Sequence, residues 1–253
     1  MLLILGMLAL CFLGFPVALA MLLSSGIFLL LQGGFDALPI IPLKMTGALN
    51  SFSFMAIPLF MLAGELMNQS DITKHIFDFA LRVVGRVKGG LAYVNVLASM
   101  MFAAMSGAAL AHASGLGKML ILTMRDKGYP PAFSAAVTGA SACIGPIIPP
   151  STMMVIAALV TDQSVGRLLI GGAIPGLLMG VGIMAVCAIM AQLYDFPSSE
   201  WGGFKALWQS FRKAFPALMT PVILVGGIFS GIFTPTAASV VTCVYAALLG
   251  LGM

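Results

Sequence analysis

The sequence predicts an all-α polytopic membrane protein that contains a re-entrant helical hairpin and a broken helix. Hydrophobic residues make up 60% of the 253 positions, charged residues only 8%, and mean hydropathy is +1.10. A soluble domain is about a quarter charged. Several apolar runs reach the roughly 20 residues that a spanning helix needs. These features exclude a water-soluble enzyme, a disordered chain and a nucleic-acid-binding protein.

The charged residues and cysteines fit the same class. The net charge is +4, and the twelve Lys and Arg lie between apolar runs, as membrane topology requires. The four cysteines all lie inside apolar segments and show no metal-ligand spacing. The N-terminal stretch MLLILGMLAL lacks a basic region and a clear cleavage site, so we interpret it as a membrane segment and not a signal peptide.

The first and last apolar runs are too long for one simple span. Gly14-Phe15-Pro16 interrupts the first, and Gly231-Ile232-Phe233-Thr234-Pro235 interrupts the last. Proline removes a backbone donor and clashes with the preceding helical turn. Each run is therefore a broken helix or a tight pair of spans. The apolar runs cover residues 1–32, 52–67, 91–124, 131–161, 167–194 and 215–253.

Two polar stretches have the periodicity of amphipathic helices that lie in the membrane interface. In 70–88 the apolar stripe comprises Ile72, Ile76, Phe79, Val83 and Val87. In 200–215 it comprises Trp201, Phe204, Trp208, Phe211 and Phe215. Basic residues occupy the opposite face of both stretches, which is typical of interface anchoring.

The distribution of basic residues predicts the orientation of the chain. Residues 69–90 carry four Lys or Arg, 125–127 carry two and 200–215 carry three, so we expect these segments in the cytoplasm. The apolar segment 91–124 is flanked by cytoplasmic charge at both ends. It therefore enters the membrane and returns to the same side as a re-entrant hairpin. The alternative is two full spans of about 15 residues each, which is short for a bilayer.

The middle of this hairpin is rich in small residues, from Met105 to Gly115. A tip at membrane depth must satisfy its freed backbone groups against protein or water. Ser106 and Ser114 can supply oxygen there. The alternative is a close helix contact through small residues, which is common in membranes.

The segment Gly145-Pro146-Ile147-Ile148-Pro149-Pro150-Ser151 cannot sit in a continuous helix. The helix should unwind about midway along 131–161. Unwound carbonyls can coordinate a hard cation, and the half-helix that starts near Ser151 directs its positive dipole end at the break, which suits an anionic substrate group. The alternative is a proline kink without a ligand.

A hairpin tip and a broken helix near the midplane are the pattern of an ion-coupled secondary transporter. A membrane assembly or structural protein without transport activity is the alternative function. An intramembrane hydrolase would need Ser106 or Ser114 within hydrogen-bond reach of His112. Gly172, Gly176 and Gly180 form a stripe that predicts a helix packing face.

Five motifs together resemble one protein family. They are 56–60 with 63–67 (AIPLF and AGELM), 106–107 (SG), 145–151 (GPIIPPS), 173–176 (AIPG) and 231–236 (GIFTPT). Over essentially its whole length the chain resembles the large membrane subunit of the tripartite ATP-independent periplasmic (TRAP) transporters, the DctM-like permeases.

The resemblance implies a sodium-coupled importer, not an enzyme, in the bacterial inner membrane. Na⁺ would be the coupling ion, and organic acids such as C4-dicarboxylates, sialic acid or sugar acids would be the cargo. The expected partners are a small DctQ-like membrane subunit and a DctP-like periplasmic substrate-binding protein. The family fold is an inverted repeat that works by an elevator motion, and this chain would be its first half.

The resemblance also assigns residues. Ser106 and Gly107 at the tip would meet Gly145, Ile148 and Pro150 at the break to form a sodium site. Ser151 and Thr152 would face the substrate. His112 is an ionisable residue near the tip, for which a functional role such as substrate binding is the default in a membrane. The alternative is a neutral histidine satisfied by a backbone carbonyl.

The resemblance divides the chain into six segments. Residues 1–67 would be N-terminal scaffold helices, 68–90 an interfacial arm helix, 91–130 the re-entrant hairpin of the transport domain, 131–194 its broken helix and following span, 195–214 an interfacial amphipathic helix, and 215–253 the start of a second repeat. Family members are considerably longer, so we expect a truncated product, a fragment or half of a split subunit.

Overall fold

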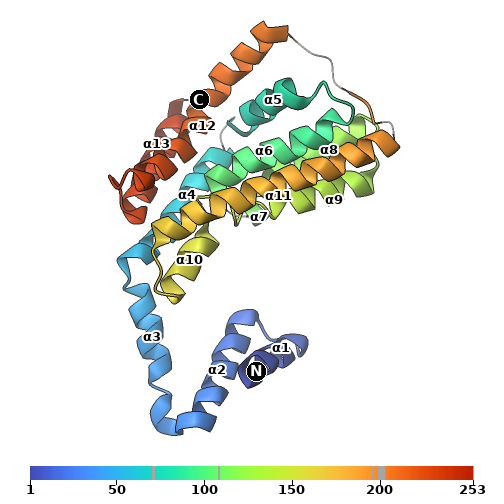
Figure 1. Cartoon of the computed structure of the whole chain (residues 1–253). Coiled ribbons are helices and arrows are strands. Elements are labelled where there is room, and N and C mark those ends of the chain that lie inside the picture. Colours follow the sequence, from blue (N-terminus) through green and yellow to red (C-terminus); the bar gives the residue numbers. More distant parts are fainter. Residues whose placement is uncertain (70–71, 108, 195, 199–202, 253) are drawn as a thin grey trace. The chain divides into compact units, whose positions relative to one another are not determined.

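The structure is a computed structural model that describes residues 1–253 except 70–71, 108, 195, 199–202 and 253 (Figure 1). Within the described residues all regular secondary structure is helical. The chain divides into two compact units, Met1–Ser51 and Phe52–Met253.

The first unit contains three α-helices and one short 3₁₀ turn, Phe35–Ala37. Helix α1 ends just before Gly14, whose φ of +88° favours glycine, and Pro16 immediately precedes α2. The two helices pack together, since a Cβ at Gly6 of α1 would lie 3.8 Å from the Ser24 Cβ of α2. The first apolar run is therefore a pair of helices. The bounds are α1 Leu2–Phe12, α2 Val17–Gly33 and α3 Ile40–Leu49.

The second unit begins with the 3₁₀ turn Phe52–Met55 and contains the hairpin and the broken helix. Helices α6, α8, α9 and α11 lie side by side in it (Figure 1). Helix α4 packs on α13, and α5 packs on both α6 and α12. Its helices are α4 Ala56–Gln69, α5 Ile72–Val84, α6 Gly90–Ser106, α7 Ala109–His112, α8 Lys118–Asp126, α9 Pro131–Ala142, α10 Thr152–Val160, α11 Val165–Leu193, α12 Gly203–Phe229 and α13 Pro235–Gly252.

Helix α11 has the surface of a lipid-facing helix. It is one of two helices in the described residues, with α12, that are long and apolar enough to cross a membrane. Its large side chains Ile174 and Leu178 are 69% and 64% exposed, whereas Gly172, Gly176 and Gly180 are buried. A helix of a soluble domain would bury its large apolar residues. The glycine stripe is thus a packing face, as predicted, and the fold is that of an all-α polytopic membrane protein.

The amphipathic stretch 70–88 forms a shorter helix than the stripe predicts. Helix α5 ends at Val84, and Val87 lies beyond it, 48% exposed. Ile72, Ile76 and Ala80 are buried, whereas Val83 is 41% exposed. Helices α6 and α12 pack on α5, and the interfacial position of this stretch stays a prediction.

The amphipathic stretch near residue 200 joins the apolar run that follows it. Helix α12 continues from Gly203 to Phe229 through Pro216 and Pro221, so positions 214 and 215 lie in one helix. Trp201 lies outside the described residues. The last apolar run breaks between α12 and α13, where Gly231 takes a φ of +71°.

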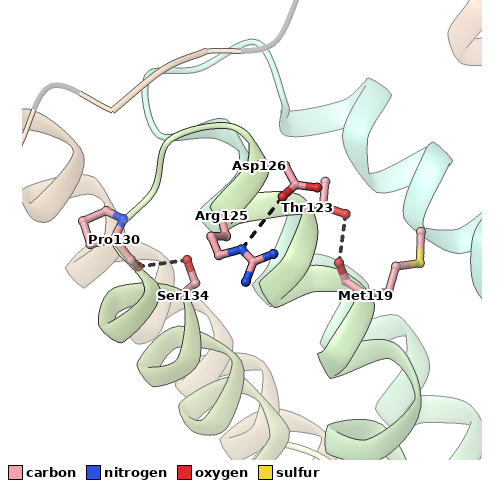
Figure 2. Close-up of polar contacts among 6 residues, drawn as sticks. All are labelled: Met119, Thr123, Arg125, Asp126, Pro130 and Ser134. Atoms are coloured by element: carbon pink, nitrogen blue, oxygen red, sulfur yellow. Dashed lines mark hydrogen bonds and ion pairs between the residues drawn. The ribbon is translucent and has the colours of Figure 1, made fainter.

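The turn between α8 and α9 carries the charges of 125–127. Figure 2 shows Thr123 donating a 2.8 Å hydrogen bond to the Met119 carbonyl before the turn, and Ser134 donating a 3.1 Å bond to the Pro130 carbonyl after it. Arg125 Nε lies 3.9 Å from the Asp126 carboxylate, and both side chains are more than half exposed. This turn therefore has the polar character that a membrane-flanking loop requires.

Candidate functional site

The hairpin turns at Gly107. Helix α6 ends at Ser106, and Gly107 adopts a left-handed conformation with φ +60° and ψ +10° while its N–H bonds the Ala103 carbonyl at 3.0 Å. Glycine favours this helix-ending geometry because it has no Cβ. The chain then returns through α7, a π-helical segment Ala113–Gly117, and α8. The backbone therefore turns where the tip is predicted, and the depth of this turn in a membrane stays a prediction. The side chains of Ser106 and Ser114 lie outside the described residues.

The helix predicted to unwind at its prolines does so. Helix α9 ends at Ala142, and α10 begins at Thr152. Between them, the amides of Ile147 and Ile148 both bond the Ile144 carbonyl. Pro146, Pro149 and Pro150 have no N–H to donate, so a helical ladder cannot form here. The Pro149–Pro150 peptide bond is cis.

Ser151 is the N-cap of α10. Its hydroxyl accepts a 3.2 Å hydrogen bond from the Met154 amide and donates one to the Pro146 carbonyl, and the residue is fully buried. An N-cap serine satisfies one of the amides that a helix start leaves free. The hydroxyl predicted to face substrate therefore also holds the break in shape. Thr152 is half-buried at the first position of α10.

The tip and the break touch each other. A Cβ at Gly107 would overlap the carbonyl oxygen of Pro150, and it would lie 2.9 Å from the Pro150 carbonyl carbon and 3.2 Å from Ser151 Cα. Glycine is thus required at position 107 for its backbone angle and for the space it leaves. Two segments more than 40 residues apart in the sequence meet as the pattern predicts.

The oxygens available at the break suit a hard cation. Within the described part of the chain, the carbonyl oxygens of Gly145, Ile148 and Pro150 accept no hydrogen bond. No group of three His, Cys, Asp or Glu side chains gathers anywhere among the described residues. Backbone carbonyls at an unwound helix are ligands for Na⁺ in transporters of this architecture, whereas transition metals favour imidazole or thiolate ligands.

Helix α11 supports the break from the side of its glycine stripe. A Cβ at Gly172 would lie 2.5 Å from the Ile147 carbonyl oxygen, and one at Gly176 would lie 2.5 Å from Ile148 Cγ1. The third glycine, Gly180, packs against the Met100 side chain of α6. The Ile147 carbonyl therefore contacts α11, while the Pro150 carbonyl contacts the hairpin tip.

A buried polar network that sequence analysis missed joins the hairpin to the broken helix. Asn95 Nδ2 of α6 donates a 2.7 Å hydrogen bond to Thr138 Oγ1 of α9. Ser99 Oγ donates to Ser141 Oγ at 2.9 Å, and Ser141 Oγ donates to Asn95 Oδ1 at 3.2 Å. The four residues are at most 3% exposed. Their helical spacings, four apart on α6 and three apart on α9, were the available signal.

His112 is buried, and its ring has no hydrogen-bond partner in the part of the chain that the structure describes. It is 1% exposed, and neither ring nitrogen has a partner among the described residues. Its ring centroid lies 5.6 Å from that of Phe102. The expectation that a backbone carbonyl satisfies the imidazole is therefore not met within the described residues. A buried polar group of this kind calls for a partner such as a ligand or water.

A groove of the second unit lies away from the tip and the break. It has a volume of about 500 Å³ at the loop between α10 and α11, where Asp162 and Gln163 meet Phe233 and Pro235. None of the predicted sodium or substrate residues lines it. The tip and the break are closely packed where Gly107 meets Pro150.

A helical membrane fold in which a glycine tip meets a proline-broken helix is typical of secondary transporters. The chain matches the family model described as tripartite ATP-independent periplasmic transporter, DctM component, over residues 4–253. This match covers nearly all of the sequence, and the chain belongs to the DctM family.

Three relatives illustrate the similarity. The sialic acid TRAP transporter large permease protein SiaM of Vibrio cholerae is 40% identical over 247 residues, which is 98% of this chain and 58% of the relative. The C4-dicarboxylate large permease DctM of Pseudomonas aeruginosa is 38% identical over 90% of this chain and 53% of the relative. The 2,3-diketo-L-gulonate large permease YiaN of Escherichia coli is 37% identical over 92% and 55%.

The chain spans about half the length of these relatives. All three are named as transport permeases and none as an enzyme, in agreement with the sequence prediction.

Proposed function

We propose that this chain carries a sodium and substrate site of a TRAP large permease that imports an organic acid. The contact between Gly107 at the hairpin tip and the Pro150 carbonyl at the break is the observation that supports it most directly. Gly145, Ile148 and Pro150 supply carbonyl oxygens that accept no hydrogen bond from the described residues. In the proposed site these oxygens and the Ser106 hydroxyl replace the hydration shell of Na⁺.

The substrate carboxylate binds beside the ion. Within the described residues, the first-turn amides of Thr152 and Met153 donate no hydrogen bond, and they lie at the positive end of α10. A bound Na⁺ raises the positive charge next to this helix end, so cation and anion binding favour each other. His112 is proposed as a further substrate contact because its buried ring nitrogens lack partners among the described residues.

The hairpin and the broken helix move together in the proposed elevator cycle. The Asn95 and Ser99 network ties α6 to α9, and the glycine stripe of α11 packs on both the break and α6. C4-dicarboxylates, sialic acid and sugar acids are the candidate cargo, since relatives are named for transport of such acids.

The proposed setting is the bacterial inner membrane. The name of the family describes a tripartite periplasmic system. The proposed partners are accordingly a small membrane subunit and a periplasmic substrate-binding protein that delivers the acid.

Gly145→Leu, made in the full-length protein with its partners, tests the function. Gly145 is buried at the break, so the leucine side chain should crowd the proposed cation site and abolish sodium-driven uptake into proteoliposomes. Gly139→Leu is the matched control, because Gly139 is exposed on α9 and a Cβ there meets nothing within 4 Å. If the Gly145→Leu protein inserts into the membrane and its uptake is undiminished, the proposal is contradicted and a membrane assembly role is favoured.

A further inference from the structure

Helices α5 and α12 enclose a polar groove that the transport site does not use. The groove has a volume of about 230 Å³. Its polar lining comes from both helices and comprises His75, Asp78, Arg82, Gln209, Ser210 and Lys213. Both helices are amphipathic, and they pack along their length through contacts such as Phe79 with Phe211, whose ring centroids are 5.6 Å apart.

The cationic residues that line this groove are Arg82 and Lys213. Neither Arg82 nor Lys213 forms an ion pair with another residue that the structure describes. Asp78 lies four residues before Arg82 on α5, yet the two side chains do not pair within 4 Å. In addition, His75 Nδ1 is buried and has no hydrogen-bond partner among the described residues. The groove is therefore lined by two cationic side chains, one carboxylate and a histidine whose Nδ1 has no partner among the described residues.

A different face of the same helix pair is apolar. It forms a groove of about 340 Å³ lined by Phe79, Val83, Phe204, Leu207, Trp208 and Phe211. Phe204 and Trp208 are 77% and 67% exposed. Exposure of such large apolar surfaces to water is unfavourable. On α12, Gln209 and Lys213 are four residues apart and share one face, while Trp208 and Phe211 share another. Exposed aromatic residues beside basic ones mark a helix at the boundary between acyl chains and headgroups.

We propose that the groove between α5 and α12 binds the phosphate headgroup of an anionic phospholipid. The apolar face places the helix pair at headgroup depth, and Arg82 and Lys213 provide the charge that a phosphodiester requires. Gln209 and Ser210 supply neutral polar groups for the rest of the headgroup. Basic pockets beside membrane helices recognise anionic lipids in this way. The site would anchor the helix pair to the bilayer, independently of the transport site.

The test measures lipid binding to the purified chain in detergent. Native mass spectrometry detects the bound lipid, and thermal unfolding detects the stabilisation that it causes. Phosphatidylglycerol is the probe, phosphatidylcholine with the same acyl chains is the zwitterionic comparison, and water-soluble glycerophosphoglycerol is the headgroup without chains. We expect binding and stabilisation by phosphatidylglycerol alone. Equal binding of phosphatidylcholine would overturn the charge argument, and equally tight binding of the soluble headgroup would overturn the assignment to a lipid.

Charge variants separate the groove from general surface charge. Arg82→Gln and Lys213→Gln should each weaken phosphatidylglycerol binding about fivefold. Asp78→Asn removes the opposing carboxylate and should strengthen it. Arg212→Gln is the matched control, since Arg212 is exposed on α12, carries the same charge and does not line the groove. A loss in Arg212→Gln equal to that in Lys213→Gln would overturn the proposal, as would weaker binding by Asp78→Asn.

Discussion

At the residue scale, Gly107 combines two demands that only glycine meets. Its φ of +60° disfavours a side chain, and the Pro150 carbonyl occupies the position of a Cβ. Gly128 has a similar backbone, with φ +87°, but a Cβ there meets nothing within 4 Å. Substitutions at the two glycines can therefore be compared to separate the free-energy cost of the backbone angle from the cost of contact with the break.

Gly107→Ala should destabilise the protein by about 1–3 kcal/mol more than Gly128→Ala, because the added methyl must displace the break as well as adopt the left-handed conformation. Chemical unfolding of the two purified variants in the same detergent measures the difference. Equal losses of stability would show that the hairpin tip does not press on Pro150.

His112→Phe should leave stability unchanged or raise it by about 1 kcal/mol, because the substitution removes a buried polar ring that has no described partner and keeps an aromatic ring beside Phe102. Substrate uptake by the same variant in the complete transporter should fall through a higher KM. A marked loss of stability in thermal unfolding would instead mean that the imidazole has a structural partner.

The sequence predicted some features of these residues and not others. A serine-glycine pair in the middle of a small-residue segment predicts a turn, and the turn lies at Gly107. A helix start near Ser151 was predicted, but the hydrogen bond from its hydroxyl to the Pro146 carbonyl was not, because that bond depends on the path of the chain between the prolines. The position of His112 against Phe102 depends on the angle between the two hairpin arms, which the sequence does not encode locally.

At the element scale, α11 packs on the break through Gly172 and Gly176, where there is no room for a side chain. A Cβ at Gly172 would lie 2.5 Å from the Ile147 carbonyl oxygen and would also meet the Met154 side chain. Gly182 lies on the same helix, is exposed, and has open space at its Cβ position. Of Gly172 and Gly182, only Gly172 is needed for packing.

Gly172→Ala should lower the free energy of unfolding by about 1–3 kcal/mol, since the backbone carbonyl of Ile147 cannot move away as a flexible side chain would. Gly182→Ala should be neutral or stabilising by up to about 1 kcal/mol through helix propensity. Thermal or denaturant unfolding of the pair provides the comparison. A similar response of both variants would refute close packing of α11 on the break.

Helix boundaries were predictable where prolines cluster and not where composition changes. Three prolines in five residues stop α9 and α10 from joining, as the local chemistry requires. Pro216 and Pro221, in contrast, lie inside the continuous helix α12. The shift from basic to apolar residues near position 215 indicated a new segment, although the backbone continues unbroken through it. The Asn95 network was missed because its partners come from two separate helices.

At the scale of the whole molecule, basic residues predict which loops face the cytoplasm. The turn 125–127 is exposed and carries Arg125 and Lys127, whereas the loop at Asp162 lies at the other end of α10 from the break. The orientation therefore has a direct test at these two loops.

With Asp162→Cys and Lys127→Cys made separately in a background without native cysteines, a membrane-impermeant maleimide should label position 162 from the periplasmic side and position 127 only after the membrane is opened. The positive-inside rule is the physical reason. The opposite labelling pattern would reverse the predicted topology.

The central claim is that the hairpin tip and the proline-broken helix form a cation site. The most direct measurement is the unfolding temperature of the purified chain as Na⁺ replaces K⁺ at constant ionic strength. A ligand that binds only the folded state raises this temperature with its concentration. The account predicts such a rise for the unmodified chain and little or none for Gly107→Ala. An unfolding temperature that does not depend on Na⁺, or an equal rise in both proteins, would contradict it.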